Sequence, residues 1–230
     1  MTESQAGSIF PPGYPLNTII KPRLEHLAEA PIPTRNGTFR LLVFRYDDPS
    51  AHPTLSDEHV ALVMGDVSGQ SHVPVRVHSE CLTSEVFGSL KCDCKEQLDA
   101  AQSLIGQRGL GVLLYLRQEG RGIGLANKIK AYALQADGVD TVEANERLHL
   151  PVDARQYDVA ADILRQLSVR SVELMTNNPE KQESLDRLGI PVVGRIPLHT
   201  GANPHSEGYL TVKRDRLRHL LPGDLGRTKH

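Results

Sequence analysis

The sequence predicts a mixed α/β fold of the α+β type, in which an antiparallel, strand-rich N-terminal half precedes alternating strands and helices. Two observations lead to this prediction. Between about residues 31 and 80, apolar residues alternate with polar ones or form short runs, which is the pattern of strands. After residue 94, apolar residues recur every three or four positions in segments separated by short apolar runs, which is typical of helices alternating with buried strands.

The first half is expected to contain three strands. They cover Thr38–Phe44, His59–Met64 and Val73–His78, and a polar, Pro-containing loop joins the first two. Residues 1–30 are predicted to form an irregular arm, because the prolines of Phe10–Pro15 and Ala30–Pro33 interrupt any regular period.

The second half is expected to contain helices and strands in alternation. The first helix has Leu98, Ala101, Leu104 and Ile105 on one face and ends near Gly106. A later helix starts at Asn178, a natural N-cap followed by Pro179, and ends at Gly189. The other strands are Gly111–Leu116, Ser171–Thr176 and Ile190–Gly194, and the other helices are Ile123–Ala136 and Gln156–Leu167, the latter with Tyr157, Ala160, Ile163, Leu164 and Leu167 facing inward.

The composition excludes several classes of protein. The 230 residues include 26 Lys and Arg and 28 Asp and Glu, for a formal net charge of −2. Nucleic-acid coats and polybasic membrane binders need a clustered excess of Lys and Arg, so neither partner is expected, and an anionic ligand must meet a local group of basic residues. No run approaches the ~20 apolar residues of a membrane span, and Met1–Phe10 lacks the pattern of a secretion signal, which predicts a cytoplasmic protein.

The three cysteines of the chain, Cys81, Cys92 and Cys94, lie in one short segment. Buried apolar thiols are the plain alternative, but the charged residues around them favour metal ligands. Three thiolates suit Zn²⁺ and leave its fourth position open for water or substrate, whereas a fourth ligand from His78 would make the site structural. Glu80 is either a solvated acid at a strand end or a proton carrier for chemistry at the metal.

A glycine-rich turn is a second candidate site. Arg121 lies between Gly120 and Gly122, where backbone N–H groups can approach phosphate oxygens, and a helix start near Ile123 adds a favourable dipole. Most such turns bind nothing, but beside a metal site this one predicts phosphate binding. Further positive charge near the turn comes from Arg117, Lys128 and Lys130.

Several motifs together resemble the GTP cyclohydrolase II family. They are Arg76–Thr83, Cys92-Asp93-Cys94, Arg117–Leu125, Lys128–Gln135, Asp140–Asn145, Asp153-Ala154-Arg155 and Thr176–Pro179. The resemblance covers roughly residues 30–220, and a series of separate motifs in order is more specific than any one of them.

The resemblance implies a zinc-dependent hydrolase of cyclic amidine C–N bonds. Such an enzyme opens the imidazole ring of GTP, releases formate and pyrophosphate, and gives 2,5-diamino-6-(ribosylamino)pyrimidin-4-one 5′-phosphate, the first step of riboflavin biosynthesis. It also implies one Zn²⁺ per subunit, Mg²⁺ to offset the charge of pyrophosphate, and a homodimer. One catalytic domain over residues 31–220 is expected between an N-terminal arm, 1–30, and a C-terminal tail, 221–230.

The resemblance also implies roles for individual residues. The zinc ligands would be Cys81, Cys92 and Cys94. The catalytic residues would be Asp153 in acid–base chemistry, Arg155 as a nucleophile, Tyr132 near the ring-opening step, and Glu80. The GTP site would comprise Arg76, Val77, His78, Ser79, Glu80, Gln97, Glu119, Gly120, Arg121, Thr141, Thr176 and Lys181.

Arg155 has two alternative roles. A guanidinium with a pKa above ~12 is a poor nucleophile unless it loses a proton, for which Asp153 would be the acceptor. Alternatively, Arg155 stabilises charge on the α-phosphate while water attacks. The plainest interpretation is an N-cap aspartate and a surface arginine at a helix start.

The chain departs from the family pattern at two places. Lys95-Glu96 follows Cys94 where the family usually has a small residue, and Leu148–Pro151 stands where it usually has Leu-Gly. Two other functions therefore remain: a paralogue of secondary metabolism that stops at the formamide, and a non-catalytic, zinc-stabilised nucleotide-binding protein. Tyr132 has an ordinary core tyrosine as its alternative, but as a retained family residue it favours the complete reaction.

Overall fold

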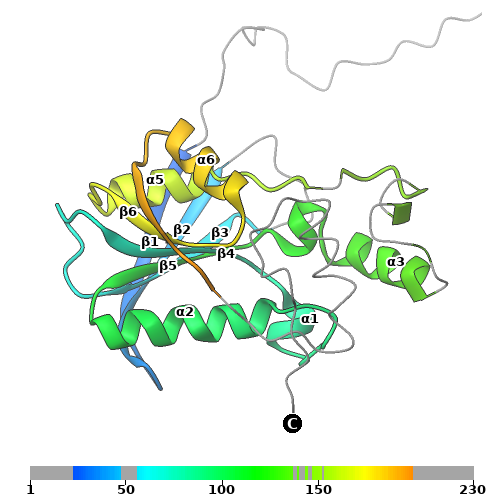
Figure 1. Ribbon diagram of the computed structural model, residues 1–230, viewed down its shortest axis with the longest axis horizontal. Helices are drawn as coiled ribbons and strands as arrows, with labels where there is room; N and C mark the ends of the chain where they lie inside the picture. Colours follow the sequence, from blue (N-terminus) through cyan, green and yellow to red (C-terminus); the bar gives the residue numbers. More distant parts are fainter. Residues whose placement is uncertain are drawn as a thin grey trace, which may run out of the picture.

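A seven-stranded sheet forms the centre of the computed structural model, with helices on both of its faces (Figure 1). The structure describes residues 23–47, 56–136, 139, 143–144, 147–151 and 153–198. The strands are β1 (Arg23–Thr34), β2 (Gly37–Asp47), β3 (Glu58–Met64), β4 (Val73–Ser79), β5 (Gly111–Leu116), β6 (Val172–Met175) and β7 (Val192–Ile196). The helices are α1 (Leu82–Glu85), α2 (Cys94–Arg108), α3 (Leu125–Ala136), α5 (Asp158–Gln166) and α6 (Pro179–Arg187), with a 3₁₀ turn at Glu119–Gly122.

The strand order β1-β2-β3-β5-β4-β6-β7 divides the sheet into two halves. The pairs β1–β2, β2–β3 and β3–β5 are antiparallel, whereas β5–β4, β4–β6 and β6–β7 are parallel. The predicted mixed α/β fold is confirmed, but β4 was expected in the antiparallel half and instead pairs parallel on both sides. Its alternating sequence resembles a half-buried strand, yet six of its seven residues are buried because helices cover both faces.

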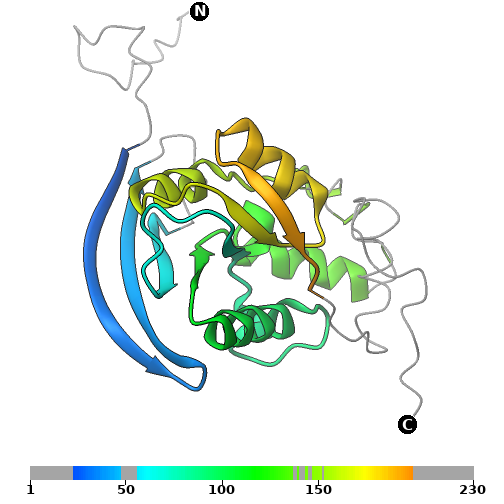
Figure 2. The same ribbon diagram turned by 60° about the vertical axis from the view of Figure 1, so that its left-hand side comes forward.

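Helices α5 and α6 cover one face of the sheet and α2 covers the other, while α3 lies beyond the ends of the parallel strands (Figures 1 and 2). The larger core cluster joins the sheet to α5, and the five residues expected to face inward in this helix or at its two ends are all buried. A smaller cluster under α2 contains Phe39, Leu113 and Met175 together with Ala101 and Ile105. The helical period therefore predicted the buried faces of both helices.

Strand β1 corrects the predicted arm, because residues 23–30 are part of a regular strand rather than irregular chain. β1 is an edge strand paired only with β2, and its prolines Pro31 and Pro33 lie opposite Arg40 and Thr38. An edge strand tolerates proline because only one side of it needs backbone donors. The rest of the predicted arm, residues 1–22, and the predicted tail, 221–230, lie outside the described residues.

The glycine predicted to end α2 has another function. The helix continues through Gly106 to Arg108, and Gly109, at φ 64°, is its left-handed C-cap. A Cβ on Gly106 would lie 2.3 Å from the backbone oxygen of Asn36, so this glycine allows the helix to approach the β1–β2 turn closely.

α6 has the predicted cap, since Asn178 accepts a hydrogen bond from the Glu180 N–H. Within the described ranges, no helix is both long and apolar enough to cross a bilayer.

Candidate active site

A cleft lies where β4, β5 and β6 end. Because these strands are parallel, the residues that follow them meet at one edge of the sheet, where ligands of open α/β sheets usually bind. The cleft has an empty volume of about 780 Å³, which includes space open to solvent. Of the predicted site residues, it is lined by Arg76, His78, Ser79, Glu80, Cys81, Cys92, Cys94, Gln97, Glu119, Gly120, Arg121, Tyr132, Arg155 and Lys181.

Three predicted site residues that the structure describes are placed differently. Val77 and Thr176 are only 1% exposed, and Val77 belongs to the core while its carbonyl accepts from Lys181 Nζ at 2.8 Å. The Thr176 hydroxyl accepts from the Asn178 N–H at 3.0 Å within its own turn. Asp153 lies behind Arg155 rather than in the wall of the cleft. Thr141 lies outside the described residues.

The three cysteines come together as predicted. Cys81 precedes α1, Cys94 begins α2, and Cys92 lies on the loop between these helices. Their sulfur atoms all lie within 4.8 Å of one another, and the Cys81 and Cys92 Sγ atoms are 3.6 Å apart. Two thiolates at a Zn–S distance of about 2.3 Å in a tetrahedral site are about 3.8 Å apart, so this arrangement fits a zinc ion.

The titration of the cluster also suits a cation. Hydrogen bonds with the Cys92 and Cys94 thiols lower the pKa of Cys81 well below its usual value. The same hydrogen bonds with Cys81 raise the pKa of the Cys92 and Cys94 thiols. One thiolate therefore forms readily, and a divalent cation would compensate the charge that builds up when the other two protons leave.

His78 does not face the sulfur atoms as a fourth ligand. Its Nε2 lies 2.7 Å from Glu85 Oε1, and its Nδ1 lies 3.5 Å from Arg76 Nη2. Burial lowers the pKa of His78 to about 4, so the ring is neutral at pH 7. With Nε2–H donating to Glu85, Nδ1 is the acceptor for Arg76 Nη2, so both ring nitrogens have partners other than a metal. This geometry favours three protein ligands with an open position over the closed structural site.

Arg76 is connected to the cysteine loop through two side chains. Its Nη2 donates to Gln97 Oε1 at 2.7 Å, and Gln97 Nε2 donates to Asp93 Oδ2 at 2.6 Å. Burial lowers the pKa of Arg76 to about 10, so the guanidinium is charged at neutral pH. Among the described residues, Arg76 Nε and Ser79 Oγ are buried atoms without a hydrogen-bond partner, and both residues line the cleft. A polar ligand would satisfy them.

The 3₁₀ turn is built around Glu119. Its Oε2 accepts from the Leu82 N–H and its Oε1 from the Gly120 N–H, both at 2.7 Å. Gly120 and Gly122 have φ of 63° and 87°, and a Cβ on Gly122 would lie 2.9 Å from the carbonyl of Ala154. The predicted glycine-rich turn therefore packs directly against the Asp153–Arg155 segment. Arg121, also at positive φ, accepts from the Ala154 N–H through its carbonyl at 3.0 Å.

Lys128 faces this turn and the cysteines. Its Nζ lies 2.8 Å from Glu119 Oε1 and 3.2 Å from Cys81 Sγ. Burial alone would lower the pKa of Lys128, but the neighbouring thiolate and carboxylate outweigh it and raise the pKa. The other basic residues expected near the turn, Arg117 and Lys130, lie outside the cleft lining, and Lys130 is exposed.

Asp153 holds Arg155 in a fixed orientation. The carboxylate accepts from Arg155 N–H at 3.0 Å and from Arg155 Nε at 2.9 Å, with a further ion pair to Nη2. Burial would raise the pKa of Asp153, but the hydrogen bonds and charge of Arg155 outweigh it and lower the pKa. The pair is therefore partly buried and ionic, unlike an N-cap with a surface arginine.

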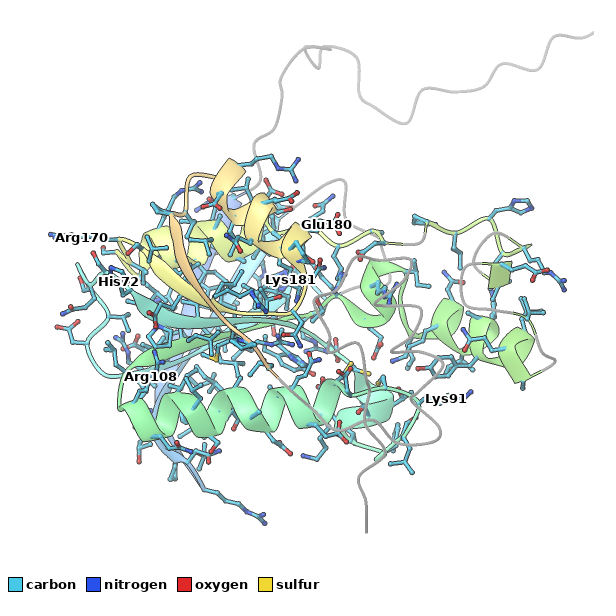
Figure 3. The ribbon with its side chains drawn as sticks, viewed as in Figure 1. His72, Lys91, Arg108, Arg170, Glu180 and Lys181 are labelled. Atoms are coloured by element: carbon cyan, nitrogen blue, oxygen red, sulfur yellow. The ribbon has the colours of Figure 1, made fainter. Side chains whose placement is uncertain are left out.

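Glu80 and Tyr132 both line the cleft that contains the cysteines. Glu80 Oε2 accepts from Arg117 Nε at 2.9 Å, and its side chain is 17% exposed. Tyr132, on α3, has the ammonium groups of Lys91 and Lys128 at 5.0 Å and 5.7 Å from its ring centre. Tyr132 is thus a half-buried cleft residue rather than a core tyrosine. Figure 3 shows Lys91 on the loop before α2, and Lys181 extending from α6 toward the sheet.

Several groups in the site were not predicted. Asn177 and Asn178 line the cleft where Thr176 was expected. Glu85 accepts from both His78 and the Tyr115 hydroxyl beneath the cleft. Tyr115 is a residue of β5 and Glu85 is the last residue of α1, so only their pairing across the fold identifies them. In the sequence, the one sign of a role for Glu85 was its position as a charged residue between Cys81 and Cys92.

Comparisons with known proteins agree on one family. The model of the GTP cyclohydrolase II family matches residues 25–197. A riboflavin biosynthesis protein RibBA from Salinispora tropica is 53% identical over 200 residues, which are 86% of this chain and 48% of that protein. GTP cyclohydrolase-2 from Acinetobacter baylyi is 51% identical over 87% of this chain and 98% of the relative, and that from Picrophilus torridus 47% over 86% and 100%. The chain thus spans about half of RibBA but nearly all of the other two relatives.

Proposed function

The chain belongs to the GTP cyclohydrolase II family of hydrolases, and we propose on this basis that it catalyses the complete reaction of that family. It would open the imidazole ring of GTP, release formate and pyrophosphate, and form 2,5-diamino-6-(ribosylamino)pyrimidin-4-one 5′-phosphate as the first step of riboflavin biosynthesis. One observation carries the proposal: a cluster of three thiols and the ionic pair Asp153–Arg155 are both at the same polar cleft.

We propose that Cys81, Cys92 and Cys94 hold zinc, since their spacing and their shared titration fit a divalent cation. When bound, zinc supplies a Lewis acid that polarises an electrophile and lowers the pKa of water. The residues around it handle protons and orientation. Glu80 is partly exposed beside Cys81, which suits exchange of protons with a ligand and with solvent.

Tyr132 is proposed to act at the ring-opening end of the cleft. Its ring lies beside two ammonium groups, those of Lys91 and Lys128. A phenol hydroxyl at that place is suited to donate and recover a proton. A cleft position of this tyrosine supports the complete reaction over a paralogue that stops at the formamide.

The basic wall of the cleft is proposed to bind the triphosphate. Arg121, Arg155 and Lys181 line it; the two arginines follow β5 in the chain, and the lysine follows β6. Mg²⁺ would offset the remaining charge of pyrophosphate, as the family resemblance implies. Arg155 is proposed as the residue that acts on the α-phosphate, with Asp153 as its partner. A carboxylate with a lowered pKa is a weak proton acceptor, which supports a charged Arg155 that stabilises the phosphate.

The covalent role of Arg155 has a direct test. Rapid quenching during a burst of pyrophosphate release would trap a guanylyl adduct on the protein if Arg155 were the nucleophile. We expect a clear pyrophosphate burst without such an adduct. Recovery of a guanylyl-Arg155 peptide would contradict the charge-stabilising role and assign the nucleophile.

The overall reaction is tested by incubating the zinc-loaded protein with GTP and Mg²⁺ and measuring formate, pyrophosphate and the pyrimidine product. Formate together with pyrophosphate is the expected result. A formamide product without formate would identify a paralogue, and tight GTP binding without any product would identify a nucleotide-binding protein. The same preparation tests the proposed homodimer, for which light scattering would give twice the mass of the chain.

A further inference from the structure

Lys128 lies where three parts of the site meet. Its ammonium is 3.2 Å from Cys81 Sγ and 2.8 Å from Glu119 Oε1. It is also 5.7 Å from the centre of the Tyr132 ring. The side chain is 11% exposed, so these groups rather than water surround most of its charge.

The position of this ammonium is fixed at both ends of the side chain. Lys128 lies in the first turn of α3, where its N–H donates to the Gly124 carbonyl at 3.1 Å. A Cβ on Gly120 would lie 3.1 Å from Lys128 Cβ, so the glycine leaves room for the stem. At the tip, Glu119 is itself held by the Leu82 and Gly120 N–H groups. A flexible lysine at the mouth of a cleft would have no such restraints.

We propose that Lys128 is an outer-sphere partner of the metal, donating an N–H hydrogen bond to the Cys81 thiolate. The inference rests on the proposed zinc site of Cys81, Cys92 and Cys94. Groups that hydrogen-bond to metal ligands orient them and tune the metal. A charged donor draws electron density from the sulfur, which leaves the metal a stronger Lewis acid.

The charges of the site agree with this role. Three thiolates around a divalent cation leave one negative charge uncompensated, and Lys128 is the ammonium in contact with one of those sulfurs. Glu119 in turn keeps the ammonium in place. Lys128 is thus a positioning residue that joins the cysteine loop to the glycine-rich turn.

Phosphate binding is the competing role for Lys128. To bind a phosphate, the Lys128 Nζ would have to leave both Cys81 and Glu119. Glu119 is only 5% exposed. Breaking a buried ion pair leaves an uncompensated buried charge, which costs several kcal/mol. Arg121, Arg155 and Lys181 also line the cleft and supply positive charge to it.

The test uses the full chain with Co²⁺ in place of zinc, because sulfur-to-cobalt charge transfer gives an absorption band that reports on the thiolates. Lys128→Met should shift this band to lower energy, since a thiolate without the hydrogen bond gives up an electron more readily. Lys128→Arg retains a charged donor and should keep the band near its wild-type position. Lys130→Met, the matched control, removes an exposed lysine from the same helix and should leave the band in place.

A second measurement on the same cobalt proteins separates the two roles. Calorimetric binding of inorganic tripolyphosphate should change less than about twofold in Lys128→Met, whereas loss of a phosphate ligand weakens it roughly tenfold or more. An unmoved band with weakened tripolyphosphate binding would overturn the proposal, as would an equal band shift in Lys130→Met. Lys128→Gln serves as the second variant if Lys128→Met does not fold.

Turnover provides a further check. Loss of an outer-sphere partner should lower kcat for ring opening by about 10- to 100-fold with little change in KM. A wild-type chain that binds no Co²⁺ would overturn the zinc site itself, and this inference with it. If Co²⁺ binds but the charge-transfer band stays in place in Lys128→Met, the role of Lys128 is overturned while the metal site stands.

Discussion

The antiparallel and parallel halves of the sheet differ in what the ends of their strands carry. β1, β2 and β3 run in alternating directions, so their ends are divided between both edges of the sheet. β4, β5 and β6 run in one direction, and their carboxyl ends lie together. Every predicted site residue that the structure describes comes from β4 or from later segments of the chain.

This difference separates stability from chemistry. Parallel pairing brings His78, Glu119 and Asn177 to one cleft, although they are far apart in the sequence. The antiparallel half contributes buried apolar side chains, such as Leu42 and Phe44, to the same core. Substitutions in the parallel half should therefore change turnover, and substitutions in the antiparallel half should change mainly the free energy of unfolding.

Cys92→Ser should have the largest effect. Serine is a poor ligand for zinc because its hydroxyl stays protonated, so the cysteine cluster should lose its metal. Ring opening should fall by about a thousandfold or more, equivalent to about 4 kcal/mol of activation free energy. Formate assays and metal analysis of the purified variant measure both effects.

The same variant tests whether the two ends of the cleft act separately. Pyrophosphate release should persist in Cys92→Ser if the phosphate chemistry depends on Arg155. Loss of both activities in a folded variant that still binds GTP would refute this separation.

A matched pair of core substitutions tests the comparison directly. Leu42 on β2 is 4% exposed and Leu116 on β5 is fully buried, and both belong to the larger core cluster. Each Leu→Ala change should lower the free energy of unfolding by about 3 kcal/mol. Only Leu116→Ala should also lower kcat, because the Leu116 carbonyl accepts from the Glu80 and Gln118 N–H groups at the cleft. Equal kcat values for both variants, measured below their unfolding transitions, would contradict the division between the halves.

Gly122→Ala should give a smaller, local effect. Gly122 has φ of 87°, and a Cβ there would lie 2.9 Å from the Ala154 carbonyl. The strain should cost about 2 kcal/mol of stability and displace the segment that holds Arg155, which should slow pyrophosphate release.

Gly109→Ala is the control for that substitution. Gly109 also has positive φ, at 64°, but a Cβ there meets nothing within 4 Å. The Gly109→Ala variant should lose stability through backbone strain, but its rate of pyrophosphate release should stay unchanged. Similar activity losses in both variants would show that strain alone, rather than contact with Ala154, explains the effect.

The fold was predictable where the signal is local. Hydrophobic period identified β2, β3, β5 and the buried face of α5, and the Asn178-Pro179 pair identified the start of α6. Strand pairing is not local, so the sequence did not place β4 between two parallel neighbours. β1 was missed because its prolines are tolerated only at a sheet edge, and no local pattern specifies an edge.

The site was likewise predictable where its residues are close in the sequence, and not where they meet through the packing of distant elements. The proximity of the three cysteines was predicted from their spacing and is found in the structure, since they belong to one short segment of the chain. The direction of Lys128 toward Cys81 was not predictable, because it depends on how α3 packs against the 3₁₀ turn. The same holds for Glu85, whose partners His78 and Tyr115 come from two strands.

The smallest effect concerns two buried histidines, one in each half of the sheet. Burial lowers the pKa of His59 on β3 and of His78 on β4 to about 4, from an ordinary value of 6.5. Between these values the unfolded chain binds more protons than the folded one, so stability is complete above pH 6.5 and falls as the pH drops toward 4. Each histidine should lower the free energy of unfolding by about 1 kcal/mol when the pH falls from 7 to 5.5.

His59→Asn isolates the contribution of the antiparallel half. The asparagine oxygen can replace His59 Nδ1, which accepts from the Arg117 N–H at 3.1 Å, but it does not titrate in this range. Urea unfolding at pH 7 and pH 5.5 should show a pH-dependent loss smaller by about 1 kcal/mol than in the wild type. Because any loss of metal at low pH affects both proteins equally, the difference between them reports His59 alone. An unchanged difference would mean that His59 is not buried in its neutral form, and that the antiparallel half contributes no pH dependence to folding.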